Sequence, residues 1–473
     1  MGILAKEQGK VSVEAPSTVE TVSKPTDMSK SIAEDILDSI SATSDNKHVK
    51  SDTIIKSLKK AHALSNKDGA GVIMRALEQV DRWDISYEMF LYACALGWLE
   101  CVEAIMADTK ADINPGDTES ECVRLASAHG QTHVVNYLLR DSRVDPTSVN
   151  NEALYYATEN EHISTVKLLL QDPRVDPSQN GTGPSACVLG MVDVVKTLLE
   201  DFRVDPNAEE GLMIRSACGN GQLEVVKVLL ADNRVDPTLQ EDDALVLACT
   251  HGHTDVVEVL LQDARVDPTS QDSEAMVKAC EFGFTDIVGR LLKDSRVDLN
   301  ARNTRCLFRA CTNGHADVVE QLLVSDKPLN VAYDHNACLR AACVKNHIQV
   351  VELLLKDSRV DPAERQDEAL RFSCRYGRDA VVELLLSDER VNPAANNNEP
   401  IRTACAMGHL SIVKRLLLES KIDPTAKFYA ASTEAYKGSH HGVLKALARD
   451  ERVDPIEMER YWSMQIEGEF RTL

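Results

Sequence analysis

The chain has 473 residues and a formal net charge of −23, from 52 Lys and Arg against 75 Asp and Glu. This acidic balance argues against duplex nucleic acid or an anionic membrane as the main partner, because both require dense Lys and Arg on one face. No apolar run approaches the roughly 18 residues of a membrane-spanning helix, and the N-terminus has no charged-then-apolar signal pattern. We therefore expect a cytoplasmic protein, with the nucleus also open as a location.

The first fifty residues offer little apolar surface to bury. Residues 1–50 are rich in Ser, Thr, Val, Lys and Glu and contain no Phe, Trp or Tyr, which predicts a disordered N-terminal tail. Residues 31–40, SIAEDILDSI, place isoleucines four residues apart. They could fold as a short amphipathic helix on a partner, or be a weakly structured stretch with incidental apolar residues. Residues 53–65 and 70–80 then predict two helices separated by a glycine-containing turn at 67–71.

A short phrase dominates the rest of the chain. Arg-Val-Asp-Pro recurs at 143–146, 174–177, 203–206, 234–237, 265–268, 359–362 and 452–455, with near-copies between them. Its apolar residue returns every 29–32 residues from Ile113 to Val453. A period this regular indicates one long stack of repeats, and outweighs the three or so globular domains that length alone would suggest.

Each repeat contains two short helices and a turn. Residues 243–252 place apolar side chains at i, i+3, i+4 and i+7, which is one face of a helix, and residues 254–262 form a second helix with the same character. Gly252 between them suits a tight turn, and the Asp-Pro that follows ends the second helix. Neither helix can hide its apolar face alone, so burial must come from neighbouring repeats.

The pattern A-L-x-x-A-C-x-x-G-H-x-x-V-V-x-x-L-L followed by Val-Asp-Pro, as at 244–261 and 306–323, resembles the ankyrin repeat. The resemblance covers 84–455 and implies an all-α, ankyrin-type solenoid of about twelve helix-turn-helix repeats with short, strand-poor turns. It makes 51–83 a helical N-terminal cap and 456–473 a C-terminal cap, since the end of a stack exposes apolar surface. Two departures stand out. The family's Thr-Pro-Leu-His opening of the first helix is replaced by sequences such as Glu152-Ala-Leu154, and the period is 31 instead of 33.

One repeat departs further. Between Val175 and Val204 the spacing is two residues short, and the first helix must begin within 180–184, where the usual Ala-Leu pair is missing. Two flexible glycines lie there, so we expect this repeat to be the weakest part of the stack.

Cysteine and histidine recur in register with the repeat. Nine of thirteen cysteines occupy one column: Cys94, Cys187, Cys218, Cys249, Cys280, Cys311, Cys343, Cys374 and Cys405. Repeats stacked about 8–10 Å apart would hold these thiols beyond disulfide reach, so they are interpreted as small buried apolar side chains. Four Cys-x-x-x-His pairs each supply two ligands where zinc requires four. We expect no metal and no cofactor.

Features repeated in every unit are assigned to the stack itself. The Asp-x-Arg pairs, such as Asp141 with Arg143, are predicted to form turn hydrogen bonds or ion pairs between repeats. The repeated histidines, such as His253, are interpreted as turn or packing residues. No nucleophile–base pair, phosphate loop or paired carboxylate site stands out, so we expect no enzyme activity.

Features that vary between units are candidates for binding. Residues two positions after the core leucine of the first helix point about 150° away from the core, onto the inner surface that the family uses for partners. These residues are Tyr92, Leu125, Tyr156, Ser216, Leu247, Lys278, Arg309, Ala341, Phe372 and Thr403. They indicate a contact surface, unless neighbouring turn tips cover them.

The early and late repeats differ in net charge. Residues 84–300 hold 16 Lys and Arg against 38 Asp and Glu, whereas residues 301–420, the late repeats, hold 16 of each. On or beside the inner columns, the late repeats bring together Phe308, Arg309, Arg340, Arg371, Phe372, Arg375, Tyr376 and Arg402. Arginine beside aromatic residues predicts an acidic partner. The alternative is that these arginines pair with Asp367, Glu368 or Glu399 within the stack.

Taken together, the sequence predicts a monomeric, non-catalytic scaffold or adaptor that holds a protein partner along the concave face of the stack. One alternative is an inhibitor or substrate receptor that delivers a partner to another machine. Another is a passive spacer whose activity resides in the N-terminal tail.

Overall fold

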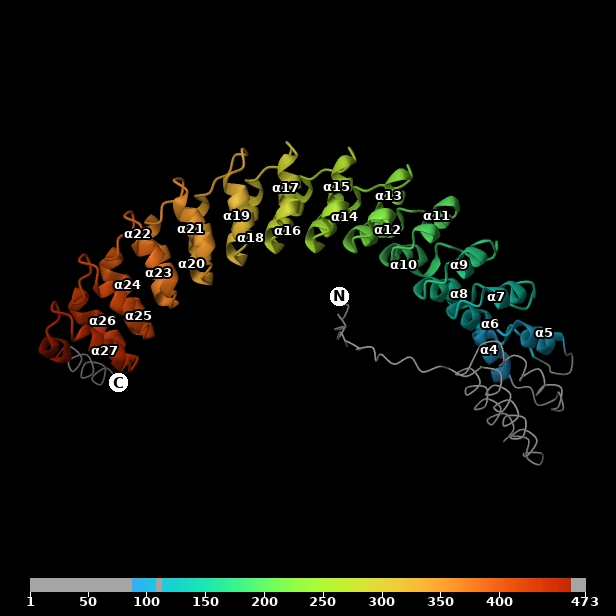
Figure 1. Ribbon diagram of the computed structural model, residues 1–473, viewed down its shortest axis with the longest axis horizontal. Coiled ribbons are helices and arrows are strands. Elements are labelled where there is room, and N and C mark those ends of the chain that lie inside the picture. The colour runs from blue at the N-terminus through green and yellow to red at the C-terminus, as the bar shows by residue number, and fades with distance from the viewer. Residues whose placement is uncertain (1–86, 108–112, 461–473) are drawn as a thin grey trace, which may run out of the picture. The chain divides into compact units, whose positions relative to one another are not determined.

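The computed structural model describes residues 87–107 and 113–460, which fall into two compact units that meet between Asp176 and Pro177. Each unit is described by itself (Figure 1). The predicted tail (1–50), N-terminal cap (51–83) and residues 461–473 of the predicted C-terminal cap lie outside the described residues, which contain no strand.

Twenty-four α-helices form twelve helix–turn–helix repeats within the described ranges. In the first unit these are α4 (Tyr87–Leu96) with α5 (Leu99–Ala107), α6 (Asp117–Ala128) with α7 (Thr132–Leu138), and α8 (Ser148–Glu159) with α9 (Ile163–Leu170). In the second unit they are α10 (Thr182–Leu189) with α11 (Val192–Glu200), α12 (Ala208–Gly219) with α13 (Leu223–Ala231), α14 (Leu239–His251) with α15 (Thr254–Gln262), α16 (Ser270–Phe282) with α17 (Thr285–Lys293), α18 (Ala301–Asn313) with α19 (Ala316–Leu323), α20 (Tyr333–Lys345) with α21 (Ile348–Lys356), α22 (Glu364–Arg375) with α23 (Asp379–Leu386), α24 (Ala395–Met407) with α25 (Leu410–Leu417), and α26 (Ala426–Lys437) with α27 (His441–Leu447).

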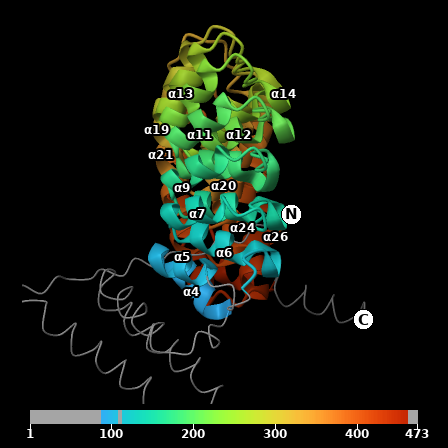
Figure 2. The same ribbon diagram turned by 90° about the vertical axis from the view of Figure 1, so that its right-hand side faces the viewer.

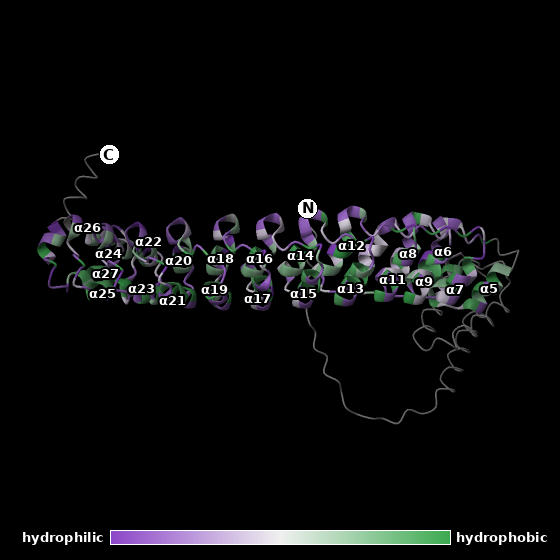
Figure 3. Ribbon diagram, turned by 90° about the horizontal axis from the view of Figure 1, so that it is seen from above, coloured by the Kyte–Doolittle hydropathy of each residue, from purple (hydrophilic) through white to green (hydrophobic). Residues whose placement is uncertain are grey.

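The helices of each unit lie in two layers. Even-numbered first helices pack on one another in one row and odd-numbered second helices in another, as in α12 against α14 and α11 against α13 (Figures 2 and 3). Between the rows lie fully buried side chains such as Ala248 and Cys249 from α14 and Val257 and Leu260 from α15. Helices this short are stable only through such packing. The predicted all-α solenoid of twelve strand-poor repeats is therefore confirmed.

All thirteen cysteines are free and buried. Burial raises the pKa of thiols such as Cys187 and Cys343 to about 12, so they stay protonated at neutral pH and behave as small apolar groups. Sequence reasoning considered one column only. Cys306 lies outside it, and its Sγ donates to the carbonyl of Leu299 at 3.4 Å.

The first turn of nearly every first helix winds to the left. In α14, Gln240, Glu241 and Asp242 have φ of 56°, 56° and 61°, and the N–H of Asp242 donates to the carbonyl of Thr238 at 3.0 Å. Three consecutive left-handed residues also occur in α6, α8, α12, α16, α20, α22 and α24. Left-handed backbone costs about 1–2 kcal/mol per residue outside glycine, so each turn needs compensating contacts.

The third left-handed residue supplies one such contact. Its side chain is buried and polar in most repeats: Ser120, Asn151, Asp242, Ser273, Thr304, Asn336, Asp367 and Asn398. Asp367 Oδ1 accepts a hydrogen bond of 2.8 Å from the backbone N–H of Asn392, 25 residues later, and Asn398 does the same with Asp423 at 2.8 Å. We call these side chains the turn-closing residues.

The Arg-Val-Asp-Pro phrase links each repeat to the one before. Arg265 Nη2 donates to Oδ2 of Asp263 at 2.6 Å, two residues away, while its Nη1 donates to the carbonyl of Val235 at 2.7 Å, 30 residues earlier. Where Pro-Leu-Asn-Val replaces the phrase at 328–331, Lys327 keeps the link through Nζ, at 2.9 Å from the carbonyl of Val297. The predicted ion pairs lie within one turn, and the guanidinium, not the aspartate, reaches the neighbouring repeat.

The repeated histidines form a second ladder. Nε2 of His253 hydrogen-bonds to the carbonyl of Gly219, and that of His315 to Glu281, each at 3.0 Å and 34 residues apart. The ring also covers the glycine that ends the preceding first helix. A Cβ at Gly314 would lie 2.4 Å from Nδ1 of His347, and Gly314 has a φ of +82°. Histidine and glycine are thus both packing residues, as predicted.

The shortened repeat is visible in α10. A short 3-10 turn, η2 (Gln179–Gly181), precedes it, and α10 begins at Thr182 and has 8 residues, against 12 in α12. Asn180 alone keeps the left-handed conformation of a non-glycine residue there. The predicted start of this helix within 180–184 is confirmed.

Candidate interaction surface

The predicted contact residues lie on the first-helix row, but they differ in exposure. Tyr92, Leu125, Leu247 and Phe372 are half-buried. Tyr156, Phe308 and Tyr376 are exposed. The first-helix row therefore carries both half-buried and exposed side chains. Its charged residues also differ from one another in their contacts.

Three of the predicted binding arginines are structural. The side chains of Arg340 and Arg371 are each only 15% exposed. Arg371 pairs with Glu399 of the next repeat at 2.7 Å and donates to the carbonyls of Gln366 and Arg365 in its own left-handed turn, at 3.0 and 3.2 Å.

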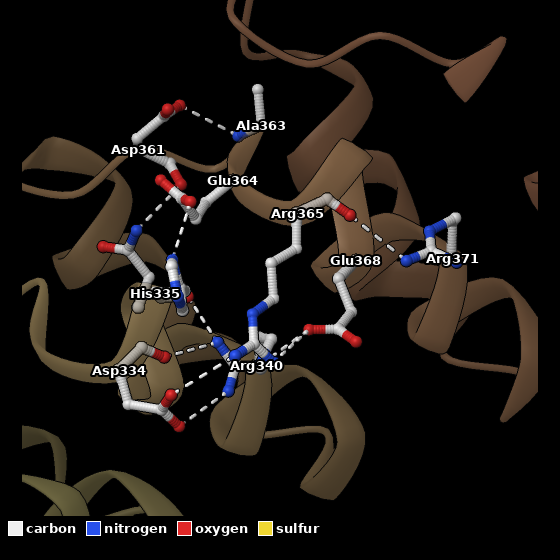
Figure 4. Close-up of polar contacts among 10 residues, drawn as sticks. Asp334, His335, Arg340, Asp361, Ala363, Glu364, Arg365, Glu368 and Arg371 are labelled. Carbon is white, nitrogen blue, oxygen red and sulfur yellow. Dashed lines mark hydrogen bonds and ion pairs between the residues drawn. The ribbon is translucent and has the colours of Figure 1, made fainter. Parts of the chain in front are cut away.

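Arg340 makes the same two kinds of contact, an ion pair with the next repeat and hydrogen bonds to carbonyls of its own turn. It lies 3.1 Å from Glu368 and donates to the carbonyls of Asp334 and His335, as Figure 4 shows. Arg402 donates to the carbonyls of Asn397 and Asn396. The donors of these three arginines therefore close the left-handed turn of their own repeat, and their contact with a partner remains a prediction. The alternative, pairing within the stack, holds for Arg340 and Arg371.

The first unit repeats this arrangement. Arg124 donates to the carbonyls of Glu119 and Thr118 and pairs with Glu152. Glu152 also hydrogen-bonds to Tyr156, which raises the pKa of that phenol. Tyr156 is thus tied to a structural ion pair, although its ring stays exposed.

A different group of side chains is exposed at the C-terminal ends of three successive first helices, α20, α22 and α24. The guanidinium of Arg375 and the ammonium of Lys345 are exposed and form no ion pair with any described residue. The Phe372 and Tyr376 rings meet edge to face with centroids 6.4 Å apart. Tyr376 and Met407 are 49% and 47% exposed. We call Lys345, Phe372, Arg375, Tyr376 and Met407 the late-repeat patch.

Sequence reasoning found three members of this patch and missed two. Lys345 and Met407 stand 31 residues before and after Tyr376, so extending that column by one period in each direction would have found them. The same column places exposed Phe282 at the end of α16, where Lys278 lies 5.9 Å from its ring centroid. On α18, Phe308 is exposed and Arg309 lies 3.8 Å from Glu281, so Arg309 is partly neutralised.

The described ranges contain no group of three or more His, Cys, Asp and Glu side chains that could hold a metal ion. Across 87–107 and 113–460, no helix is both long enough and apolar enough to cross a bilayer.

A search of curated proteins finds no match. Among solved structures, the crystal structure of the human ASB11 ankyrin repeat domain is similar at 21% identity, covering 40% of this chain and 95% of that one, with a TM-score of 0.32.

The family model described as "Ankyrin repeats (3 copies)" matches residues 90–181, 185–272, 276–366 and 338–428. These segments make up more than half of the chain and follow the described helix pairs through both units. The protein therefore belongs to the ankyrin-repeat family, whose members are generally protein–protein interaction modules.

Proposed function

We propose that the chain is a non-catalytic interaction scaffold that holds an acidic protein partner on the first-helix row of its late repeats. The observation that carries the proposal is the late-repeat patch. It combines exposed aromatic and apolar side chains with two cations that have no ion-pair partner among the described residues.

Two physical features make this patch suited to an acidic segment. An exposed cation gains more from a new carboxylate than one already paired, because no existing interaction has to be broken. Aromatic rings beside a guanidinium exclude water from the new pair, as at binding hot spots. Arg340, Arg371 and Arg402 fix the left-handed turns that open α20, α22 and α24, the helices whose C-terminal ends carry the patch.

The proposal takes the chain as a monomer of the cytoplasm, with the nucleus also open, and gives it no catalytic role, no cofactor and no binding to nucleic acid or membrane. The acidic surface of residues 84–300 supports a protein partner, since phosphate backbones and anionic lipids would be repelled.

Two variants test the proposal, one with substitutions in the late-repeat patch and one with a charge reversal at a control position. Partners captured by the wild-type chain are identified by mass spectrometry, and their affinity is then measured with Arg375→Glu plus Tyr376→Ala. The control is Lys293→Glu, an exposed lysine in the last turn of the second helix α17. We expect at least tenfold weaker binding for the double variant, unchanged binding for the control and equal melting for both. Equal binding by all three proteins would contradict the proposal.

Deletion of residues 1–50 tests the alternative functions. A scaffold keeps its partners after this deletion, and an inhibitor or substrate receptor would do so as well. A passive spacer with activity in the tail would lose all of them, and that result would replace the proposal.

A further inference from the structure

The ladder of repeated histidines contains one arginine. In nine repeats the residue just before the second helix hydrogen-bonds to a carbonyl near the end of the first helix of the preceding repeat. Six of these residues are histidine, as at His347 and His409, two are Gln131 and Gln222, and one is Arg378. The position therefore requires an N–H donor but no charge.

Arg378 makes the ladder contact with Nε alone, which donates to the carbonyl of Val344 at 2.9 Å. In the repeats on either side, His347 and His409 make the same contact with Nε2, at 2.9 and 3.1 Å. The terminal nitrogens of Arg378, Nη1 and Nη2, bind no residue in the part of the chain that the structure describes. Since histidine closes the same contact in both neighbouring repeats, the stack does not depend on the positive charge of Arg378.

Other arginines of the late repeats have their terminal nitrogens bound. Nη1 and Nη2 of Arg390 donate to carbonyls 30 and 35 residues earlier, and both terminal nitrogens of Arg371 have acceptors within the stack. The carboxylate of Asp379, which follows Arg378 in sequence, accepts a hydrogen bond from Ser411 of the next repeat. Arg378 is thus held through Nε while its two terminal nitrogens stay available.

Arg378 also lies beside the late-repeat patch. Its acceptor, Val344, is the residue before Lys345, and Arg375 and Tyr376 precede Arg378 by three and two residues. Arg378 is half-buried, whereas Lys345 and Arg375 are exposed. Three cations that have no ion-pair partner among the described residues therefore lie near the C-terminal ends of α20 and α22.

We propose that Arg378 is a further binding residue of the late-repeat patch and holds a carboxylate of the partner through Nη1 and Nη2. This inference rests on the proposed function, since it takes the acidic partner as given. A guanidinium can bind both oxygens of one carboxylate through two parallel hydrogen bonds. The contact from Nε to Val344 restricts the side chain before binding, so less conformational entropy is lost than for a free arginine.

Arg378→His tests the inference, because histidine keeps the ladder contact and has no second pair of donors. The probe is a fluorescein-labelled copolymer of glutamate and tyrosine, which offers carboxylates together with aromatic rings. Its affinity for the full chain is measured by fluorescence anisotropy at low salt and about pH 8, where an ordinary histidine is neutral. The matched control is Lys293→Gln, which removes one exposed positive charge from the last turn of α17.

We expect about fivefold weaker binding for Arg378→His, with a smaller dependence of affinity on salt, and wild-type affinity for Lys293→Gln. The midpoint of thermal unfolding should be the same in all three proteins. If Arg378→His lowers the midpoint, Arg378→Gln takes its place, because Gln222 makes the ladder contact through its side-chain amide at 2.7 Å.

The double variant Arg375→Glu plus Tyr376→Ala separates this inference from the proposed function. If the double variant weakens binding of the copolymer and the Arg378 variants do not, the inference is wrong and the proposed function stands. If none of these variants weakens binding, the copolymer binds outside the patch, and the inference fails together with the proposed function. A wild-type chain that does not bind the copolymer would also overturn the inference.

Discussion

Arg174 donates from Nη1 to the backbone carbonyl of Val144 at 2.9 Å while its Nη2 holds Asp172 at 2.7 Å. One guanidinium therefore closes its own turn and binds the turn of the repeat before. The same two contacts recur in other repeats, at Arg265 in a complete phrase and at Arg390 in the near-copy Arg-Val-Asn-Pro. The phrase is repeated because it joins adjacent repeats, and not because it recognises a ligand.

Replacing such an arginine should cost more than breaking a surface ion pair. Arg265→Ala removes the donor to Val235 and should lower the free energy of unfolding by about 1–2 kcal/mol. Arg290→Ala breaks only the ion pair with Glu258 and should cost less than about 1 kcal/mol. Denaturant unfolding monitored by circular dichroism measures both. Equal losses would mean that the carbonyl contact adds nothing to the ion pair.

The left-handed turns predict an unusual response to glycine. Val149 is a β-branched residue with a φ of 53° and is 42% exposed. Val149→Gly should raise the free energy of unfolding by about 1 kcal/mol, because glycine adopts this conformation without steric cost.

The control for Val149→Gly is Val188→Gly in α10, where the valine is also exposed but lies in a right-handed helix. There glycine should be destabilising by about 1 kcal/mol. Opposite signs in a thermal or denaturant melt support the turn, whereas destabilisation by both variants would contradict it.

These turns also mark the limit of what sequence could predict. Periodicity identified the helix pairs and the buried columns, because apolar side chains at i, i+3, i+4 and i+7 have one interpretation in a stack. The handedness of the opening turn leaves no such pattern. Gln240 and Glu241 are not residues that favour left-handed backbone, and their carbonyls accept hydrogen bonds from Gln271, 31 and 30 residues later. The turn contacts of Arg340, Arg371 and Arg402 could not be predicted for the same reason, since their acceptors are carbonyls of a turn that the sequence does not reveal.

Burial of the turn-closing residue makes stability depend on pH at two repeats, because it raises the pKa of Asp242 and of Asp367. Burial raises the pKa of Asp242, which accepts hydrogen bonds from the N–H of Asp267 at 3.1 Å and from Ser270 Oγ. A folded-state pKa above the unfolded value of 3.8 gives stability that is present at low pH and lost as pH rises through the folded pKa.

Asp242→Asn should therefore stabilise the protein more at pH 7 than at pH 4. Asparagine can keep the backbone contact, as Asn398 does with Asp423. Asp242→Ala loses that contact and should cost about 1–3 kcal/mol at both pH values. Denaturant unfolding of the three proteins at pH 4, 5, 6 and 7 gives the comparison. A gain from asparagine that shrinks as pH rises would show the sign to be wrong.

Charge reversal separates the structural arginines from the proposed binding arginine. Arg371→Glu places a carboxylate beside Glu399 and removes two donors from the turn at 365–366. It should lower the free energy of unfolding by about 2–3 kcal/mol, and Arg340→Glu should behave similarly beside Glu368. Arg375→Glu changes the same charge on an exposed side chain and should leave melting unchanged. A protein with Arg371→Glu that melts like wild type would remove the structural role.

Local stability should fall at α10. The helix has 8 residues where α12 has 12, it starts after Gly181 at a φ of 67°, and only Asn180 and Gly181 take the left-handed conformation there. Fewer helical residues mean fewer buried side chains and fewer backbone hydrogen bonds to break on local opening. Amide hydrogen exchange by mass spectrometry should therefore be faster in peptides covering 180–190 than in those covering α8 or α12.

A variant that strengthens α10 gives a second test. Gly183→Ala, inside the helix, is not a usable variant, because its Cβ would lie 3.0 Å from Sδ of Met213. Gly181→Asn keeps a residue that tolerates positive φ and reduces the freedom of the unfolded chain, so it should slow exchange across α10. Uniform exchange from 148 to 219 in the wild-type protein would show that the shortened repeat is no weaker than its neighbours.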